Sequence, residues 1–168
     1  MDRLLILGAG QYSRIVREIA EESARFERID FLDDRGGDGT VGVLADYSRL
    51  AGTYTHATVA LGNSELRLRL LGELEVCGYC IASIISARAC VSREATLDVG
   101  CIVEPMAVIQ TGCKLGRGCL VSAGAILRHH AVLGDGCHAD CNSVIDTDAI
   151  ISPGLHIPCG TFYQGNGD

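Results

Sequence analysis

Residues 109–139 read IQTGCKLGRGCLVSAGAILRHHAVLGDGCHA and carry an aliphatic residue or alanine at every sixth position. The same period runs without a slip from Ile85 to Ile157, with Ala139 as its only small member. A second register of mostly small residues follows four positions after each aliphatic one. Neither the 3.6-residue helical period nor two-residue alternation produces this pattern, whereas a hexapeptide repeat does, and it is typical of a parallel β-helix.

Each hexad is expected to form one flat side of a triangular coil. The aliphatic residue would fill the interior, and the small residue would let the chain turn the corner. Three hexads make one coil, so residues eighteen positions apart should stack on neighbouring coils at about 4.8 Å. The repeat therefore predicts about four coils over residues 81–168.

The first 80 residues predict a separate α/β domain. A buried strand over residues 3–7 leads into a glycine turn and then into a helix in which Ile15, Ile19 and Ala20 recur at helical spacing. Further strands are expected over residues 29–32 and 57–61. The amphipathic helix that follows carries Leu66, Leu70, Leu71 and Leu74. This order of elements is a miniature of the Rossmann pattern.

The strand ends of this domain carry the candidate residues for a nucleotide. Glycines let a backbone approach phosphate at a helix N-terminus, and an acidic strand end can take ribose hydroxyls. The predicted substrate-binding residues are Gly8, Gly10, Gln11, Tyr12, Asp33, Asp34 and Asn63. About 80 residues supply only one mononucleotide half, which favours a nucleotide-activated sugar over NAD. The competing interpretation is a tight turn without a ligand.

The charge and composition of the chain limit the classes of binding partner. The net charge of −7 and the lack of a Lys/Arg cluster argue against nucleic acid or an anionic membrane as partner. No segment approaches the ~18 apolar residues of a membrane span, and the start of the chain reads as a buried strand rather than as a signal peptide. We therefore expect a cytoplasmic protein.

The hexapeptide repeat explains the positions of four of the nine cysteines. Cys101, Cys113, Cys119 and Cys137 fall in the inward small-residue register, where a free thiol behaves as a compact hydrophobe. Cys77 and Cys80 form a CxxC motif at the end of a predicted helix, with no second pair at zinc-finger spacing. Thiols in a reducing compartment are the favoured interpretation, with redox or metal chemistry as the alternative.

Three of the five histidines lie close together on the repeat: His129, His130 and His138. None occupies an inward register. Thr111, His129 and Thr147 are separated by eighteen residues and should form one column, as should His138 and His156. Outward-facing imidazoles on a rigid solenoid are either solvated surface or functional, and clustering favours a functional role.

The segments LLILGAG, FLDD and ALGNSELRLRLL, together with a hexapeptide domain that contains an aliphatic-x-His-x-x-V-aliphatic-G-D motif, resemble the NeuD/PglD-like sugar O- and N-acyltransferases. The resemblance covers nearly the whole chain. It implies an N-terminal mini-Rossmann domain that binds a nucleotide-activated sugar, followed by a left-handed parallel β-helix. It also implies a homotrimer with acetyl-CoA bound between subunits. Separately, no metal is expected, because the histidines lack the spacing of a known zinc site.

The same resemblance implies the catalytic residues. The general base of the family matches His129, its second histidine beside the thioester matches His138, and its oxyanion-binding amide falls at Thr147. Two positions depart from the family. His130 stands where an acidic residue usually orients the catalytic histidine, and the first turn reads GAGQYS instead of GAGGHG.

Two other functions compete with acetyl transfer. A γ-class carbonic anhydrase also uses a β-helix trimer, but its zinc ligands include two histidines five residues apart, a spacing that is missing here. A non-catalytic nucleotide-sugar sensor or scaffold would keep the trimer without the chemistry. For either trimer, the register before the aliphatic one should supply an exposed apolar face. Its expected members are Ile102, Val108, Leu120, Ile126 and Val132.

Overall fold

The computed structural model describes residues 2–165 of the chain, which divides into two compact units between Ile84 and Ile85. The first unit is an α/β domain with a four-stranded parallel sheet in the order β2-β1-β3-β4. Its strands are β1 (Asp2–Leu7), β2 (Phe26–Leu32), β3 (His56–Val59) and β4 (Cys80–Ile81). Its helical elements are α1 (Gln11–Glu22), η1 (Leu44–Asp46), α2 (Tyr47–Leu50) and α3 (Ser64–Val76).

Burial in this unit follows from the central place of β1. Residues 4–7 are all completely buried, as expected for a strand that pairs on both sides in a parallel sheet. On α1 the buried apolar residues are Val16, Ile19 and Ala20, whereas Ile15 is exposed. The sequence-based choice of Ile15 was wrong by one position, because the i, i+3, i+4 stripe starts at Val16.

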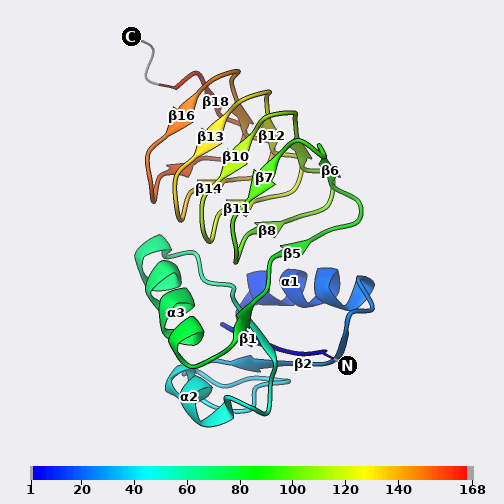
Figure 1. Ribbon diagram of the computed structural model, residues 1–168, viewed down its shortest axis with the longest axis vertical. Helices are drawn as coiled ribbons and strands as arrows, with labels where there is room; N and C mark the ends of the chain where they lie inside the picture. The colour runs from blue at the N-terminus through cyan, green and yellow to red at the C-terminus, as the bar shows by residue number, and fades with distance from the viewer. Residues whose placement is uncertain (1, 166–168) are drawn as a thin grey trace. The chain divides into compact units, whose positions relative to one another are not determined.

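The second unit is a stack of short parallel strands arranged in three sheets, consistent with a left-handed β-helix (Figure 1). One sheet contains β7 (Thr96–Leu97), β10 (Lys114–Leu115), β13 (Val132–Leu133) and β16 (Ile150–Ile151). A second contains β5 (Ile84–Ile85), β8 (Ile102–Val103), β11 (Leu120–Val121), β14 (His138–Ala139) and β17 (His156–Ile157). The third contains β6 (Cys90–Val91), β9 (Val108–Ile109), β12 (Ile126–Leu127), β15 (Val144–Ile145) and β18 (Phe162–Tyr163).

The strand pairing confirms the eighteen-residue register. Lys114 pairs with Val132, Leu120 with His138, and Ile126 with Val144, each pair one coil apart. The interior holds both predicted registers, and from Cys101 to Ile151 almost every member is buried. Ile85 is the exception at the start, with 42% of its surface exposed, and Tyr163 continues the aliphatic register against the core at the other end.

The sequence suggested that the small residues let the chain turn the corners of the coil, and the structure places the left-handed backbone one residue before them. At every sixth position from Gly100 to Gly160, the residue before the small one has a positive φ. Glycine occupies seven of these eleven corners, because it adopts left-handed backbone at little cost. The four exceptions are Met106, His130, Asn142 and Asp148.

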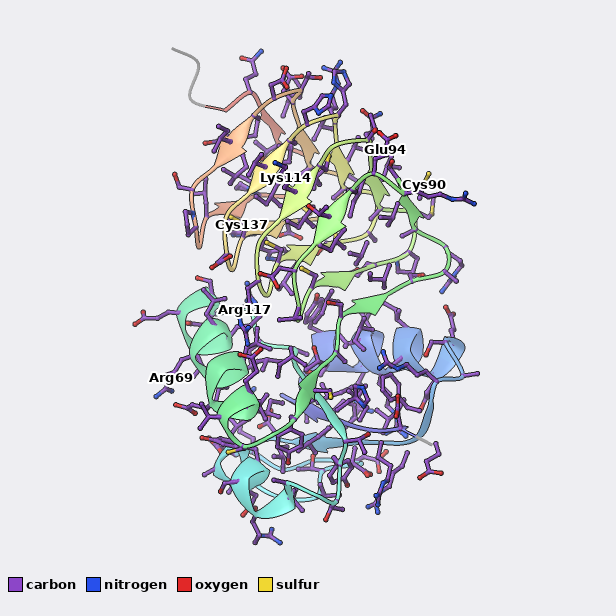
Figure 2. The ribbon with its side chains drawn as sticks, viewed as in Figure 1. Arg69, Cys90, Glu94, Lys114, Arg117 and Cys137 are labelled. Carbon is purple, nitrogen blue, oxygen red and sulfur yellow. The ribbon has the colours of Figure 1, made fainter. Side chains whose placement is uncertain are left out.

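The exposed apolar face also has different members from those that the sequence predicted. Ile102 and Leu120 are buried within the single chain, so they cannot belong to an exposed face. The sheet of β6, β9, β12, β15 and β18 instead carries an unbroken outward apolar column. Its members are Cys90, Val108, Ile126, Val144 and Phe162. The sheet of β10 is mixed at the same register, since it places Lys114 beside Val132, and Figure 2 labels Lys114 and Cys90 on these two sheets.

Candidate functional site

The first turn of the α/β unit leaves a helix N-terminus open. Gly10 is the N-cap of α1 and provides no side-chain hydrogen bond to the helix, and the first turn contains no acidic residue. A Cβ atom at Gly10 would meet nothing within 4 Å, whereas one at Gly8 would lie 2.9 Å from Leu61 Cδ2. Gly8 is therefore needed for close packing, and Gly10 leaves space for a ligand. Free amides and the helix dipole at such an end suit a phosphate group.

Asp33 fastens this turn to the end of β2. Its Oδ2 accepts the Ala9 amide at 2.8 Å and its Oδ1 accepts the Arg35 amide at 2.9 Å. These two amides, with Arg35 first, hold the pKa of the buried Asp33 carboxyl below its ordinary value. Both carboxylate oxygens thus already have backbone partners, which makes Asp33 a residue that shapes the turn.

Replacing Asp33 with Asn should destabilise the protein by about 1–3 kcal/mol at neutral pH, because one of the two amides then faces an NH₂ group. The folded-state pKa is lowered, so the stabilisation is present above the unfolded value near pH 4 and is lost as pH falls through the folded value. Urea unfolding followed by circular dichroism should show the difference between wild type and Asp33→Asn shrinking below about pH 4. A difference that stayed constant down to pH 2 would contradict this role.

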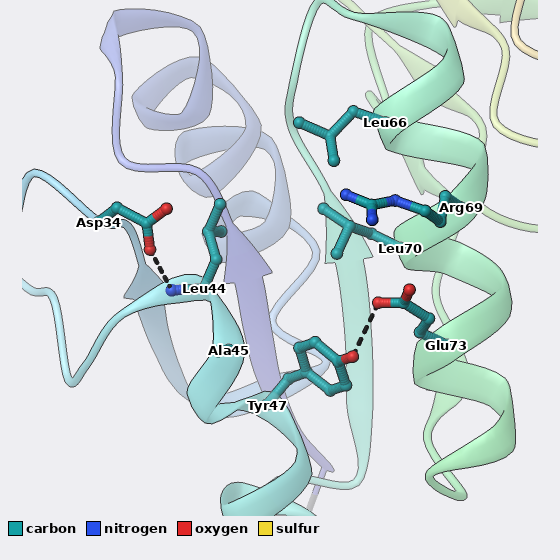
Figure 3. Close-up of a pocket in the computed structure, with 8 residues that line it drawn as sticks. All are labelled: Asp34, Leu44, Ala45, Tyr47, Leu66, Arg69, Leu70 and Glu73. Atoms are coloured by element: carbon teal, nitrogen blue, oxygen red, sulfur yellow. Dashed lines mark hydrogen bonds between the residues drawn. The ribbon is translucent and has the colours of Figure 1, made fainter.

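Asp34 and Asn63 also make local hydrogen bonds. Asp34 Oδ1 accepts the Leu44 amide at 2.9 Å, and Asn63 Oδ1 caps α3 by accepting the Leu66 amide at 2.8 Å. Asp34 lines a pocket of about 360 Å³ between the 44–47 segment and α3 (Figure 3). Tyr47 and Arg69 also line this pocket, and neither was a candidate from the sequence. The Tyr47 hydroxyl donates to Glu73 Oε2 at 2.7 Å. Gln11 is exposed and Tyr12 is half-buried on α1.

His129 lies beside Thr147 on the next coil, as the eighteen-residue register predicted. Its Nε2 is 3.2 Å from Thr147 Oγ1, and the ring is half-buried. The His129 amide donates to Gln110 Oε1 at 2.9 Å, which anchors the backbone on the coil below. Thr111 instead directs its hydroxyl to the Glu94 carboxylate. A half-buried imidazole held by a hydroxyl is suited to proton transfer.

The amide of Thr147 already has an acceptor. It donates to Asp146 Oδ1 at 2.8 Å, and the same oxygen accepts from Arg128 Nη1 at 2.5 Å. A carbonyl oxygen that bound this amide would have to take the place of Asp146. Arg128 and Asp146 are eighteen residues apart, so the register could have revealed this pair from the sequence.

His130 occupies a left-handed corner with φ of 63°. Its ring lies 5.6 Å from that of His129 at an interplanar angle of 84°, an edge-to-face contact. Gly112 lies directly against the His130 ring, since a Cβ there would approach Nδ1 to 2.2 Å. His130 therefore contacts His129 through its ring, in the position where the resembled family has a carboxylate.

His138 belongs to a second polar group on the sheet of β14. Its Nε2 is 2.9 Å from Ser122 Oγ, and Ser122 also hydrogen-bonds the buried Glu104. Burial raises the pKa of Glu104, although the Ser122 hydroxyl and the Ala123 amide act in the opposite direction. Ser122 and Glu104, eighteen residues apart, were not recognised from the sequence because the search considered histidines alone.

None of the nine cysteines, all of which lie within residues 2–165, forms a disulfide. Cys101, Cys113, Cys119 and Cys137 are buried in the β-helix interior, as predicted. Cys77 ends α3 and Cys80 opens β4, so this CxxC motif spans a helix-to-strand turn. Among residues 2–165, no helix has the length and apolar character needed to cross a membrane.

The two units together define an α/β domain followed by a left-handed β-helix. Residues 3–74 match the family described as the PglD N-terminal domain. This finding confirms the resemblance noted in the sequence. No curated protein matches the chain at a significant level.

Solved structures share the fold over nearly the whole chain. The acetyltransferase domain of PglB from Neisseria gonorrhoeae FA1090 matches with a TM-score of 0.71 and 24% identity, covering 93% of this chain and 96% of that one. The same domain in complex with acetyl coenzyme A gives a TM-score of 0.69 at 24% identity, with coverage of 92% and 94%. A mutant perosamine N-acetyltransferase from Caulobacter crescentus, in complex with CoA and GDP-perosamine, gives 0.65 at 19% identity, with coverage of 96% and 90%.

Proposed function

We propose that this protein is an acetyl-CoA-dependent acetyltransferase that acts on an amino or hydroxyl group of a nucleotide-activated sugar. The observation that carries the proposal is the half-buried His129, held 3.2 Å from Thr147 on the outer wall of a β-helix. The fold is shared with solved acetyltransferases: the PglB domain in complex with acetyl coenzyme A, and a perosamine N-acetyltransferase in complex with CoA and GDP-perosamine.

The reaction needs a base and does not need an acyl-enzyme. His129 accepts the proton of the attacking amine or hydroxyl while the new N–C or O–C bond forms at the thioester carbonyl. The C–S bond then breaks, and the CoA thiolate takes a proton from the imidazolium. Negative charge develops on the carbonyl oxygen and requires fixed donors. We assign this task to the Thr147 amide, whose hydrogen bond to Asp146 Oδ1 must be replaced by one to the carbonyl oxygen of the thioester. We place His138 beside the thioester.

The sugar nucleotide is proposed to bind the α/β unit. Its diphosphate would lie over the Gly8–Tyr12 turn, where α1 has an open N-terminus. Its base and ribose would lie near Asp34 and Asn63, with the Tyr47 and Arg69 pocket beside Asp34. Asp33 would act there by shaping the turn, given that both of its oxygens hold amides.

A homotrimer would cover the outward apolar column of the β6–β18 sheet. His129 lies two residues after the end of β12, so the proposed base lies next to the edge of this sheet, where a neighbouring subunit would reach it. An unpartnered apolar strip of this kind favours association through closed symmetry. Light scattering at micromolar concentration should give a trimer, and a monomer would contradict this part of the proposal.

The activity itself is tested by thiol release from acetyl-CoA with amino-sugar and hydroxy-sugar nucleotides that carry UDP, GDP or CMP. Turnover with one of them, together with mass-spectrometric detection of the acetylated product, supports the proposal. Binding of the sugar nucleotide without affinity for acetyl-CoA by calorimetry would favour the non-catalytic sensor or scaffold instead.

The role of the Thr147 amide predicts a small effect for Thr147→Val. Valine keeps the backbone N–H and the shape of the side chain but removes the hydroxyl that contacts His129. We expect kcat to fall by less than about tenfold, the equivalent of one neutral hydrogen bond. A loss of 10³-fold or more would show that the hydroxyl, and not the amide, is the group that matters.

A further inference from the structure

Two segments of the β-helix repeat the same pattern one coil apart. His138-Ala139-Asp140-Cys141 is followed eighteen residues later by His156-Ile157-Pro158-Cys159. The strand pairing aligns them, because His138 of β14 pairs with His156 of β17. Neighbouring outward positions on paired strands bring their side chains into contact. The register therefore gathers side chains that are distant in sequence.

The distances within this group fit a single ion. The rings of His138 and His156 are stacked with centroids 4.8 Å apart and an interplanar angle of 20°. Asp140 Oδ2 lies 3.0 Å from His156 Nε2, and Asp140 Oδ1 lies 3.9 Å from His138 Nε2. Ligand atoms of a tetrahedral zinc site with bonds of about 2.0–2.1 Å lie about 3.3–3.4 Å apart. These two separations bracket this value, and the three ligand atoms all lie within 4.8 Å of one another. Because the stacked rings are nearly parallel, one imidazole must turn before both nitrogens can bind the same ion.

The charges and the exposure of these groups also suit a cation. An ordinary aspartate has a pKa of about 4, and the Cys141 amide donates to Asp140 Oδ1 at 2.7 Å, which favours the charged form. The carboxylate is thus ionised at neutral pH. The side chains of His138, Asp140 and His156 are 22%, 27% and 55% exposed, so solvent reaches the group and can supply a fourth ligand.

We propose that His138, Asp140 and His156 form a binding site for a divalent transition metal such as zinc. Binding through His138 Nε2 would replace its present contact with Ser122 Oγ. The proposed function places the same imidazole beside the thioester, so the metal and the acyl donor would compete for His138. The expectation of no metal rested on histidine intervals along the sequence. It overlooked the carboxylate between two histidines of neighbouring coils.

Cys141 and Cys159 form a second possible set around the same Asp140. A thiol must lose its proton to bind a metal, whereas neutral imidazole binds directly. The histidine set is therefore the one assigned.

Calorimetric titration of the chelator-treated full chain with Zn²⁺ tests the site. One zinc should bind per chain, and His156→Ala and Asp140→Asn should each weaken binding by at least about 100-fold, since even outer-shell partners of metal ligands matter by 10–100-fold. The controls His130→Ala and Cys141→Ser/Cys159→Ser should bind as wild type does. Absence of zinc binding, or undiminished binding by His156→Ala, would overturn the proposal.

Cobalt substitution identifies the ligand set. Co²⁺ bound by His138, Asp140 and His156 should absorb in the visible range without a near-ultraviolet thiolate-to-metal band. A strong near-ultraviolet band that disappears in Cys141→Ser/Cys159→Ser would overturn the assignment and move the metal to the cysteines. Because the readout is binding and not turnover, failure here leaves the proposed acetyl transfer untouched.

Discussion

His129→Ala should reduce kcat for acetyl transfer by roughly 10²–10⁴-fold, the loss typical of a missing general base. The donor should still bind, because the imidazole contacts Thr147 and not the interior of the β-helix. Steady-state kinetics would give the fall in kcat, and calorimetry would give an acetyl-CoA affinity close to that of the wild type.

His130→Ala is the matched control, since it removes a neighbouring imidazole from an exposed corner of the same coil. It should lower turnover far less, as only the edge-to-face contact with His129 is lost. The opposite result, with near-normal turnover in His129→Ala and none in His130→Ala, would mean that the base has moved by one residue. His130 would then be a catalytic group.

Ile126→Glu should dissociate the proposed trimer into monomers. Ile126 is the middle member of the outward apolar column, and a trimer would bury three copies of it. An uncompensated buried charge costs about 3–5 kcal/mol, so three copies should prevent association at micromolar concentration. Light scattering would measure the mass. Acetyl-CoA binding should disappear with the trimer, because the donor is proposed to lie between subunits.

Val132→Glu is the corresponding control. Val132 is half-buried at the same register as Ile126, but its sheet places Lys114 next to it. A glutamate there finds a cation nearby, so the trimer should persist. If both variants dissociated, the interface would involve more than the β6–β18 sheet. If neither did, the apolar column would not be the interface.

The repeat determined most of the β-helix in advance. A six-residue period leaves only one way to bury both the aliphatic and the small register, so Val121, Leu127 and Cys119 are interior as predicted. The same arithmetic placed His129 beside Thr147 and His138 beside His156. In the first unit, the sequence also predicted β1, β2, β3, α1 and α3, because each of these strands contains a short apolar run followed closely by a glycine or acidic turn. It did not predict β4, η1 or α2.

Features that depend on backbone geometry or on contacts away from the repeat arithmetic came only from the tertiary structure. The left-handed corner at His130 is invisible in a pattern of hydrophobicity, because the pattern carries no φ angle. The contacts of Asp33 with the Ala9 and Arg35 amides, which hold the Gly8 turn to the end of β2, are likewise visible only in the tertiary structure.

For the outward-facing residues of the β-helix, the sequence likewise predicted the direction of each side chain, and the tertiary structure decided its exposure. The sequence treats Ile102, Leu120 and Ile126 as equivalent, yet the first two are buried in the single chain while Ile126 stays half-exposed. A period reports which residues share a direction from the coil axis. It does not report what lies outside the coil, because that depends on how distant parts of the chain pack in three dimensions.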